Sequence, residues 1–157
     1  MPSLAPATGY AVLGLGYLAA AAGKPALVRD IASACDLPAP YLAKTLNRLG
    51  RAGIVKTRRG IHGGVSLARA AAELTLYEVC EALDDPILEN RCLLGTDECS
   101  ERRACPAHAF RTKHREQAMT FLRETTIADV ASFETQRRWA ALASMQPTTN
   151  GNSISAG

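Results

Sequence analysis

Apolar residues recur at helical spacing along most of the chain and predict a protein built mainly from amphipathic helices. Residues 8–22 are expected to form the first helix, with Thr8 as its N-cap, and Gly23 ends it. Residues 28–35 form the second helix, in which Cys35 belongs to the apolar face and serves packing.

A third helix is expected over residues 41–50, with Pro40 at its start and a tight break between it and the second helix. One face is apolar and would be buried, and it carries Leu42, Leu46 and Leu49. The opposite face is polar and basic, and it carries Tyr41, Lys44, Thr45, Asn47 and Arg48. Two short helices joined by a tight turn, the second with such a face, are typical of a helix-turn-helix.

A β-hairpin is expected directly after this helix, with strands over residues 54–58 and 65–68. Its turn is rich in glycine, and Gly60, Gly63 and Gly64 would supply the positive φ values that a tight turn needs. A helix-turn-helix followed by a hairpin with arginines at its tip predicts a winged helix. The third helix would enter the major groove of DNA, about 12 Å wide, while the wing reaches phosphates or the minor groove.

Charge is concentrated in the same part of the chain, since residues 37–72 hold seven basic and no acidic residues. The whole chain carries +3, so the remainder sums to −4, and this asymmetry is typical of a protein with a polyanionic partner, with a merely solvated basic face as the alternative. At the wing tip His62 either touches a phosphate or is simply solvated. The expected DNA-binding residues are Tyr41, Lys44, Thr45, Asn47, Arg48, Arg58, Arg59 and His62.

The C-terminal half predicts further helices and no second globular domain. Thr75 and Glu78 have capping-box spacing and start a helix in which Cys80 packs inward. A long helix over residues 107–124 is more typical of a dimerisation element than of an isolated strut. Thr126 begins a short packing helix that reaches Phe133. The expected organisation is a winged helix-turn-helix domain (8–84), a cysteine-rich loop (85–107), a dimerisation helix with a short packing helix (108–135) and a disordered tail (145–157).

Three cysteines and a histidine lie close together in the loop, as Cys92, Cys99, Cys105 and His108 with the spacing C-x6-C-x5-C-x2-H. The intervening residues are polar and loop-like, whereas cysteines that serve packing usually sit in an apolar pattern. Soft thiolates on a loop suit an iron–sulfur cluster, zinc or Cu(I). A Cys3His structural zinc site and a metal-free thiol switch that uses Cys99 and Cys105 are the alternatives.

Several classes of protein are disfavoured. No uninterrupted apolar run is long enough to span a membrane, and the apolar start lacks the basic segment of a signal peptide. Five cysteines, an odd number, suggest a reducing cytoplasm rather than a disulfide framework. An enzyme is not expected because no orienting acid, oxyanion motif or phosphate loop accompanies the cysteines, and an electron-transfer protein would not need the basic helix and wing.

Four stretches together resemble one family of winged-helix regulators, which includes the iron–sulfur assembly regulator IscR, the nitric oxide sensor NsrR and the iron-responsive regulator RirA. The stretches are GYAVLGLGYLA, YLAKTLNRLGRAGIVKTRRGIHGGVSLAR, the cysteine loop running into CPAHAF, and TTIADV. They cover roughly residues 8–135, and the Arg-Gly-x-x-Gly-Gly core of the wing is their most specific part.

The resemblance implies a homodimeric cytoplasmic transcription factor, expected to be a repressor, that binds a double-stranded DNA operator and senses iron–sulfur, redox or nitric oxide status. Cys92, Cys99 and Cys105 match the family's cluster cysteines, although the first gap is one residue longer than usual, and His108 matches a fourth ligand of [2Fe–2S] members. NsrR-type members take a carboxylate from the partner's first helix, where this chain has Gly9. The fourth ligand would then be His108, another residue, water or a small thiol. His108 favours a [2Fe–2S] cluster, whereas an open fourth position would favour a [4Fe–4S] cluster.

Overall fold

The computed structural model describes residues 3–95, 97–103 and 105–144, and it confirms a mainly helical winged helix-turn-helix. Its regular elements, in chain order, are α1 (Pro6–Ala20), α2 (Val28–Cys35), α3 (Ala39–Arg51), β1 (Val55–Arg58), β2 (Gly64–Leu67), α4 (Leu76–Ala82), α5 (His108–Glu124) and α6 (Ile127–Ser144). Short 3-10 turns lie at Ala71–Glu73, Pro86–Leu88 and Glu101–Arg103. The described part contains no helix long and apolar enough to cross a membrane.

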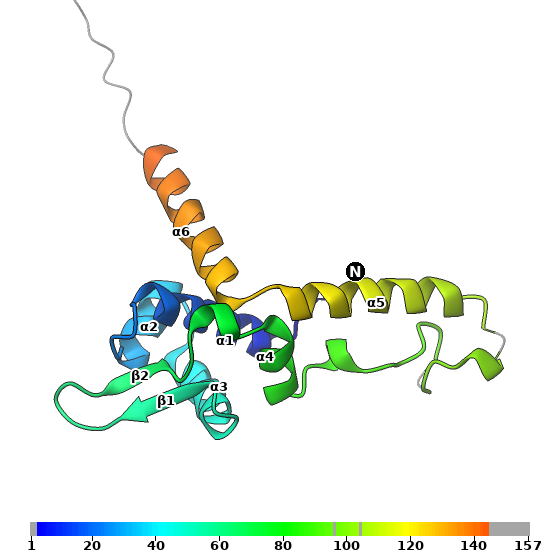
Figure 1. Ribbon diagram of the computed structural model, residues 1–157, viewed down its shortest axis with the longest axis horizontal. Coiled ribbons are helices and arrows are strands. Elements are labelled where there is room, and N and C mark those ends of the chain that lie inside the picture. Colours follow the sequence, from blue (N-terminus) through cyan, green and yellow to red (C-terminus); the bar gives the residue numbers. More distant parts are fainter. Residues whose placement is uncertain (1–2, 96, 104, 145–157) are drawn as a thin grey trace, which may run out of the picture.

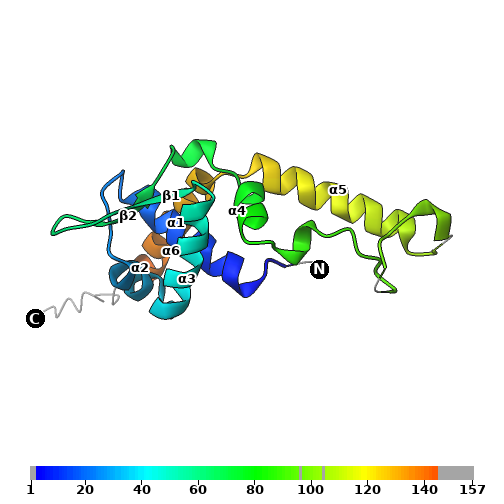
Figure 2. The ribbon, with the colours of Figure 1, turned by 90° about the horizontal axis from the view of Figure 1, so that it is seen from below.

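The molecule has a body and an arm (Figures 1 and 2). The body holds α1 to α4 and the β1–β2 wing, and α6 packs along α1. The arm consists of α5, whose C-terminal end meets the body, and the described residues between 85 and 107, which lie alongside it. The cysteine loop therefore lies at the far end of the molecule from the wing, although in the sequence it lies between α4 of the body and α5 of the arm.

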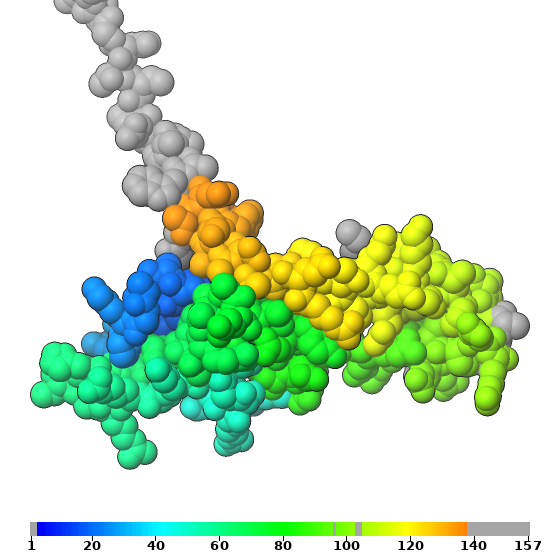
Figure 3. Space-filling view, in the orientation of Figure 1, coloured from blue at the N-terminus to red at the C-terminus, as the bar shows by residue number. Residues whose placement is uncertain are grey.

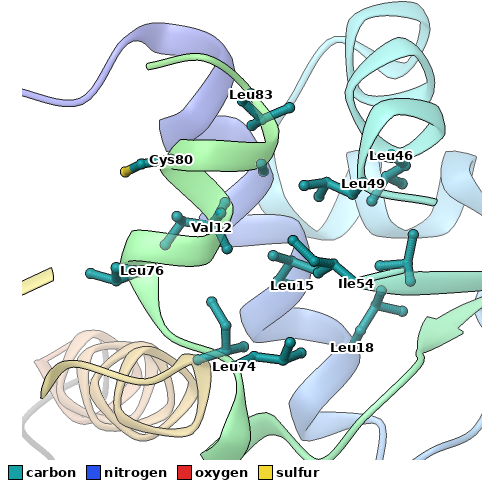
Figure 4. Close-up of a cluster of buried hydrophobic side chains, with 14 of the residues drawn as sticks. Val12, Leu15, Leu18, Leu46, Leu49, Ile54, Leu74, Leu76, Cys80 and Leu83 are labelled. Carbon is teal, nitrogen blue, oxygen red and sulfur yellow. The ribbon is translucent and has the colours of Figure 1, made fainter. Parts of the chain in front are cut away.

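Apolar side chains from every element of the body, mainly leucine, isoleucine and valine, form one core (Figure 4). Leu15 and Leu18 of α1 meet Leu49 of α3 and Leu74 ahead of α4, and each of the four is almost fully buried. Burying such a side chain contributes about 1.5–3 kcal/mol, so this cluster fixes the position of α3 relative to α1. The core thus sets the platform from which α3 and the wing project.

The wing is an antiparallel pair in which Val55 faces Leu67 and Arg58 faces Gly64. A bridge between Ala26 and Val65 fixes β2 to the segment before α2, through two backbone hydrogen bonds of 2.8 and 2.9 Å. Gly64 has φ +145°, and a Cβ at this position would lie 2.6 Å from the carbonyl oxygen of Ala26. The wing is therefore attached to the body through the start of β2, next to its turn.

The starts of α4 and α6 are joined side by side. Thr75 and Glu78 form the expected capping box, and Thr126 and Asp129 form a second one at the start of α6. Thr75 and Thr126 pair as an isolated bridge, in which the Leu76 N–H donates to the Thr125 carbonyl at 2.9 Å. The chain therefore returns from the arm beside the start of α4, the helix from whose other end it leaves the body.

Several expectations for local structure were wrong. Thr8 is not an N-cap but a buried residue inside α1, because the helix starts earlier, at Pro6. The short helix expected to end at Phe133 continues to Ser144. Positive φ occurs at Gly60 and Gly64 but not at Gly63. The expected disordered tail, residues 145–157, lies outside the described residues.

Candidate nucleic-acid interface and cysteine site

The α3 helix is amphipathic, as the sequence predicts. Leu42, Leu46 and Leu49 are buried in the core, while Tyr41, Lys44 and Asn47 are exposed. Basic residues in the last turn, Arg48 and Arg51, complement the negative end of the helix dipole. The exposed side of α3 is free to contact a groove of DNA.

Thr45 is an exception among the predicted DNA-binding residues. Only 4% of it is exposed, and its Oγ1 donates to the Tyr41 carbonyl, one turn earlier, at 2.9 Å. A helical hydroxyl that is satisfied by its own backbone can be buried at little cost. The expectation that Thr45 lies on the exposed face was therefore wrong, and it is not available for contact with DNA.

Arg48 is half-buried and is already held by an acidic partner. Its guanidinium donates to Oδ2 of Asp84 at 2.7 Å and lies 3.4 Å from the carbonyl oxygen of Ala82. Asp84 follows α4 in a left-handed conformation, with φ +50°, and its side chain is highly exposed. Arg48 therefore links α3 to the residue that precedes the cysteine loop.

Tyr41 is held at the start of α3 by an aromatic contact. Its ring meets that of Tyr10 in α1 edge to face, with centroids 5.5 Å apart and planes at 82°. This is a favoured geometry for an aromatic pair. The half-exposed Tyr41 ring is thereby oriented by the body of the protein.

The wing carries Arg58, Arg59 and His62, all exposed. The wing and α3 protrude from the same face of the molecule, the lower face in Figures 1 and 3. Together with Lys44 and Arg51 they give this face a positive charge. Such a surface suits a polyanion and gives it a helix for the major groove and a hairpin beside it.

The cysteine loop is folded back on itself. Arg91 pairs with Glu98 as an isolated bridge, the Cys92 N–H donates to the Asp97 carbonyl, and the Cys99 N–H donates to the Asn90 carbonyl at 2.8 Å. The Asn90 side chain returns a bond to the Cys99 carbonyl at 3.2 Å. These bonds bring Cys92 and Cys99 to the start of α5.

The four predicted ligands meet as two pairs. Cys92 Sγ lies 3.8 Å from Cys105 Sγ, and Cys99 Sγ lies 3.3 Å from Nδ1 of His108. Across residues 3–95, 97–103 and 105–144, no three Cys, His, Asp or Glu side chains form one group that could hold a metal ion. The thiol of Cys105 has Cys92 as its neighbour, whereas the sequence suggested Cys99 as the partner in a thiol switch.

Two arginines of α5 support this loop and were missed in the sequence. Arg111 donates to the carbonyls of Glu89 and Arg91, each at 3.1 Å, and Arg115 donates to that of Leu88 at 3.2 Å. Their spacing from His108 places all three on one face of α5, which is the signal that could have identified them. Asn90 and Asp84 had no comparable signal, because their partners are distant in the sequence.

The remaining two cysteines serve packing, as predicted. Cys80 is fully buried, and burial, with a contribution from the nearby Asp85 carboxylate, raises the pKa of its thiol to about 12. Cys35 is half-buried, and its thiol lies 3.8 Å from the Leu13 carbonyl. Neither thiol lies in the cysteine loop.

A family model described as an iron-dependent transcriptional regulator, Rrf2, matches residues 4–132. The chain belongs to the Rrf2 family. The match covers α1 to α5 and the start of α6, including all four predicted metal ligands. It establishes the chain as a transcriptional regulator of a DNA-binding family, and not as an enzyme.

Relatives and solved structures agree with this assignment. The chain is 35% identical over 130 residues to the protein aau3 of Rhizobium meliloti, covering 82% of this chain and 84% of that one. It is 28% identical over 108 residues to the regulator IscR of Klebsiella pneumoniae, covering 69% and 66%. The fold resembles CymR, the global cysteine regulator of B. subtilis, with a TM-score of 0.70, 25% identity and coverage of 85% and 98%. It also resembles T. potens IscR, with a TM-score of 0.62, 24% identity and 93% coverage of both chains.

Proposed function

We propose that this Rrf2-family regulator is a cytoplasmic homodimer whose affinity for its DNA operator depends on an iron–sulfur cluster held by Cys92, Cys99, Cys105 and His108. The observation that carries the proposal is the meeting of these four side chains, as two close pairs, at the start of α5. A reducing cytoplasm would keep the loop thiols available as ligands.

The pairwise arrangement suits a [2Fe–2S] cluster. Such a cluster has two irons, and each takes two protein ligands, so one pair of thiols and one thiol–imidazole pair supply the required set. When bound, the cluster would supply reactivity toward oxidants and nitric oxide and a dependence on iron supply. A [4Fe–4S] cluster is the second possibility for the same residues.

On the DNA side, we assign the major groove to the exposed face of α3, with Tyr41, Lys44 and Asn47. Arg58, Arg59 and His62 of the wing are assigned to phosphates and the minor groove. Arg48 joins them only when its bond to Asp84 opens. The support for these assignments is exposure on one face of the molecule together with the local excess of positive charge.

The homodimer rests on the exposed side of α5. Phe110 and Phe121 are both largely exposed, and a spacing of eleven residues, about three turns, places them on the same side of the helix. Met119 and Leu122 face the opposite way and are buried against the body. Two copies packed through their phenylalanine faces would place two α3 helices on one operator.

The link between the loop and α3 is proposed to run through Asp84 and Asp85. The buried Asp85 carboxylate accepts from the N–H groups of Ala5 and Ile87, which fixes the point where the chain leaves α4. Asp84, next to it, holds Arg48. A change in loop order would shift this junction, and the Arg48 guanidinium would change its position on the DNA-binding face.

The test compares protein purified without oxygen by visible absorption and by iron and acid-labile sulfide content. The wild type is expected to be coloured, with equal iron and sulfide, while Cys99→Ser and His108→Ala change the spectrum or lose the cluster. The matched controls are His114→Ala and Cys35→Ser, and both are expected to keep the wild-type spectrum. His114 is a second histidine of α5, and its Nδ1 lies 3.0 Å from the Phe110 carbonyl. Colourless protein with stoichiometric zinc would contradict the proposal.

The regulatory half of the proposal needs its own measurement. The protein is used to enrich a binding duplex from random-sequence DNA, and the affinity for that duplex is measured with the cluster present and after its removal. A change of tenfold or more is expected. Equal affinities would leave the cluster without a regulatory role.

A thiol switch is the second candidate, and it is favoured by the 3.8 Å distance between Cys92 and Cys105. Hydrogen peroxide would accept two electrons and the two thiol protons from this pair, its O–O bond would break to give two water molecules, and one disulfide would form. Cluster-free protein treated with hydrogen peroxide would then yield a Cys92–Cys105 peptide by mass spectrometry, with altered DNA affinity. Absence of that peptide would leave the cluster as the sensing group.

A further inference from the structure

The tip of the wing is a fixed turn rather than a loose loop. Arg58 pairs with Gly64, and the Gly63 N–H donates to the Gly60 carbonyl at 2.9 Å, which closes a four-residue turn from Gly60 to Gly63. Gly60 has φ +106°, and a Cβ at Gly63 would lie 2.2 Å from the carbonyl oxygen of Arg58. Ile61 and His62 are therefore held at the two corners of the turn.

Ile61 is 98% exposed, more than any other large apolar side chain in the described part of the protein. A single exposed apolar residue is common on proteins and needs no explanation by itself. The position of this one is different. Its neighbours Gly60, Gly63 and Gly64 have no side chains to cover it, and the wing points away from the body and the arm (Figures 1 and 2).

The surroundings of Ile61 indicate which partner covers it. Arg58, Arg59 and His62 are exposed beside it, and no acidic residue occurs between positions 37 and 72. An apolar side chain surrounded by cations suits a surface with phosphates at its edges and an uncharged interior. The minor groove of DNA has this character, because its sugar walls are apolar, and apolar side chains inserted there are a known mode of contact.

We propose that Ile61 inserts into the minor groove of the operator, where it packs between the sugar walls while Arg59 binds the flanking phosphates. This rests on the proposed DNA contact of the wing and adds an interaction that does not depend on charge. It also makes the wing sensitive to the width and the floor of the groove, which depend on base sequence.

The first test is the salt dependence of affinity for the duplex enriched from random-sequence DNA. Ile61→Ala is expected to weaken binding about three- to tenfold at every salt concentration, with no change in the slope of log affinity against log salt. Arg59→Ala is expected to reduce that slope by about 1. Leu27→Ala, which truncates another exposed apolar side chain, ahead of α2 and outside the proposed DNA contacts, is the matched control, and an equal loss there would contradict a specific role for the isoleucine.

The second test changes only the floor of the groove. Replacing inosine by guanine at the base pairs under the wing adds a 2-amino group to the minor groove and leaves the major groove unchanged. The advantage of wild type over Ile61→Ala should be present with inosine and lost with guanine. If Ile61→Ala binds as wild type on both duplexes while Arg59→Ala is weakened, the insertion is wrong but the wing still binds DNA. If both variants bind as wild type, the proposed role of the wing fails as well.

Discussion

Backbone space at single positions decides where this chain tolerates a side chain. Gly64, where β2 begins after the turn of the wing, has a positive φ and lies against the Ala26 carbonyl, whereas a Cβ at Gly9, inside α1, would have nothing within 4 Å. The two glycines therefore predict opposite effects of the same substitution.

Gly64→Ala is expected to destabilise the protein by about 2 kcal/mol or more, because both the conformation and the contact oppose a Cβ. Gly9→Ala, as the control, should stabilise α1 by up to about 1 kcal/mol, since alanine loses less backbone entropy in a helix. Chemical denaturation of each variant measures the difference. Equal stabilities would contradict the geometry described at Gly64.

Thiol reactivity should separate the cysteines. Because burial raises the pKa of Cys80 to about 12, almost none of it is thiolate at pH 8, and the thiolate is the reactive form. Iodoacetamide applied to cluster-free folded protein is expected to label Cys99 and Cys105 but to label Cys80 only after denaturation. Peptide mass spectrometry measures this, and early labelling of Cys80 would show that α4 opens readily.

For single residues, the sequence predicted the role of a side chain better than it predicted the atoms that the side chain contacts. Cys35 and Cys80 were correctly separated from the loop cysteines, since an apolar pattern reveals packing. Thr45 was misplaced because its hydroxyl bonds within its own helix, and hydrophobic periodicity does not register such a bond. The partner of Cys105 could not be predicted, because the folding of a loop depends on backbone bonds between residues without periodicity.

Between elements, the ion pair of Arg48 and Asp84 should oppose DNA binding. Asp84→Asn frees the guanidinium for a phosphate and is expected to raise DNA affinity about two- to fivefold, the range of an exposed ion pair. Asp36→Asn is a close control, because Asp36 also ends a helix in the left-handed conformation, with φ +55°, and asparagine tolerates it equally well. Equal gains in both variants would indicate a general charge effect. A loss in Asp84→Asn would mean that Asp84 orients Arg48 for DNA.

The capping box of α4 predicts a dependence of stability on pH. Glu78 accepts from the Thr75 N–H at 3.0 Å and from Arg69 at 2.6 Å, and these bonds hold the pKa of its carboxyl below the ordinary value. Its folded-state pKa is thus lower than its unfolded-state value. The associated stability is present above about pH 4.5 and is lost as the pH falls through the folded-state pKa.

Glu78→Gln should therefore reduce the loss of stability between pH 6 and pH 3 by about 0.5 kcal/mol, a small effect because the side chain is partly exposed. Glutamine can still accept the backbone bond, so the helix start is retained. Glu81→Gln removes the same charge from an exposed position of the same helix and serves as the control. Thermal unfolding across this pH range distinguishes them, and identical profiles would contradict the assignment.

The presence of a helix or strand could be predicted where its own residues determine it. The second and third helices, the hairpin and both capping boxes follow from spacing and cap residues. The end of α6 was not predictable, because it depends on packing against α1, and contacts between distant parts of the chain outweigh local propensity.

For the whole molecule, the exposed phenylalanines predict how two copies associate. Phe121 on α5 is 60% exposed and Phe133 on α6 is 61% exposed, so each can be replaced without opening the core. Phe121→Asp is expected to give monomers and to weaken DNA binding at least tenfold, because both half-sites are no longer bound together. Sedimentation and DNA titration measure both. If Phe133→Asp gives the monomers instead, the interface is built on α6.

The overall shape could not be predicted from the sequence. A cysteine loop between a DNA-binding domain and a long helix suggested a location between them, yet α5 runs outward and carries the loop to the far end of the molecule. The direction of a helix as it leaves a domain depends on the packing of its ends, such as the pairing of Thr75 with Thr126. No pattern in α5 itself encodes it.

That pairing gives the arm an unusual independence. The incoming chain is hydrogen-bonded to the start of α4, and the outgoing chain leaves from the end of the same short helix, so the arm begins and ends on one element of the body. A protease that cut the far end of the arm would leave two fragments still joined by the Leu76–Thr125 hydrogen bond and through α1 and α6. For the same reason, a cysteine loop of different length or composition can replace this one without a change in the DNA-binding body, so the same body can be combined with different sensing loops.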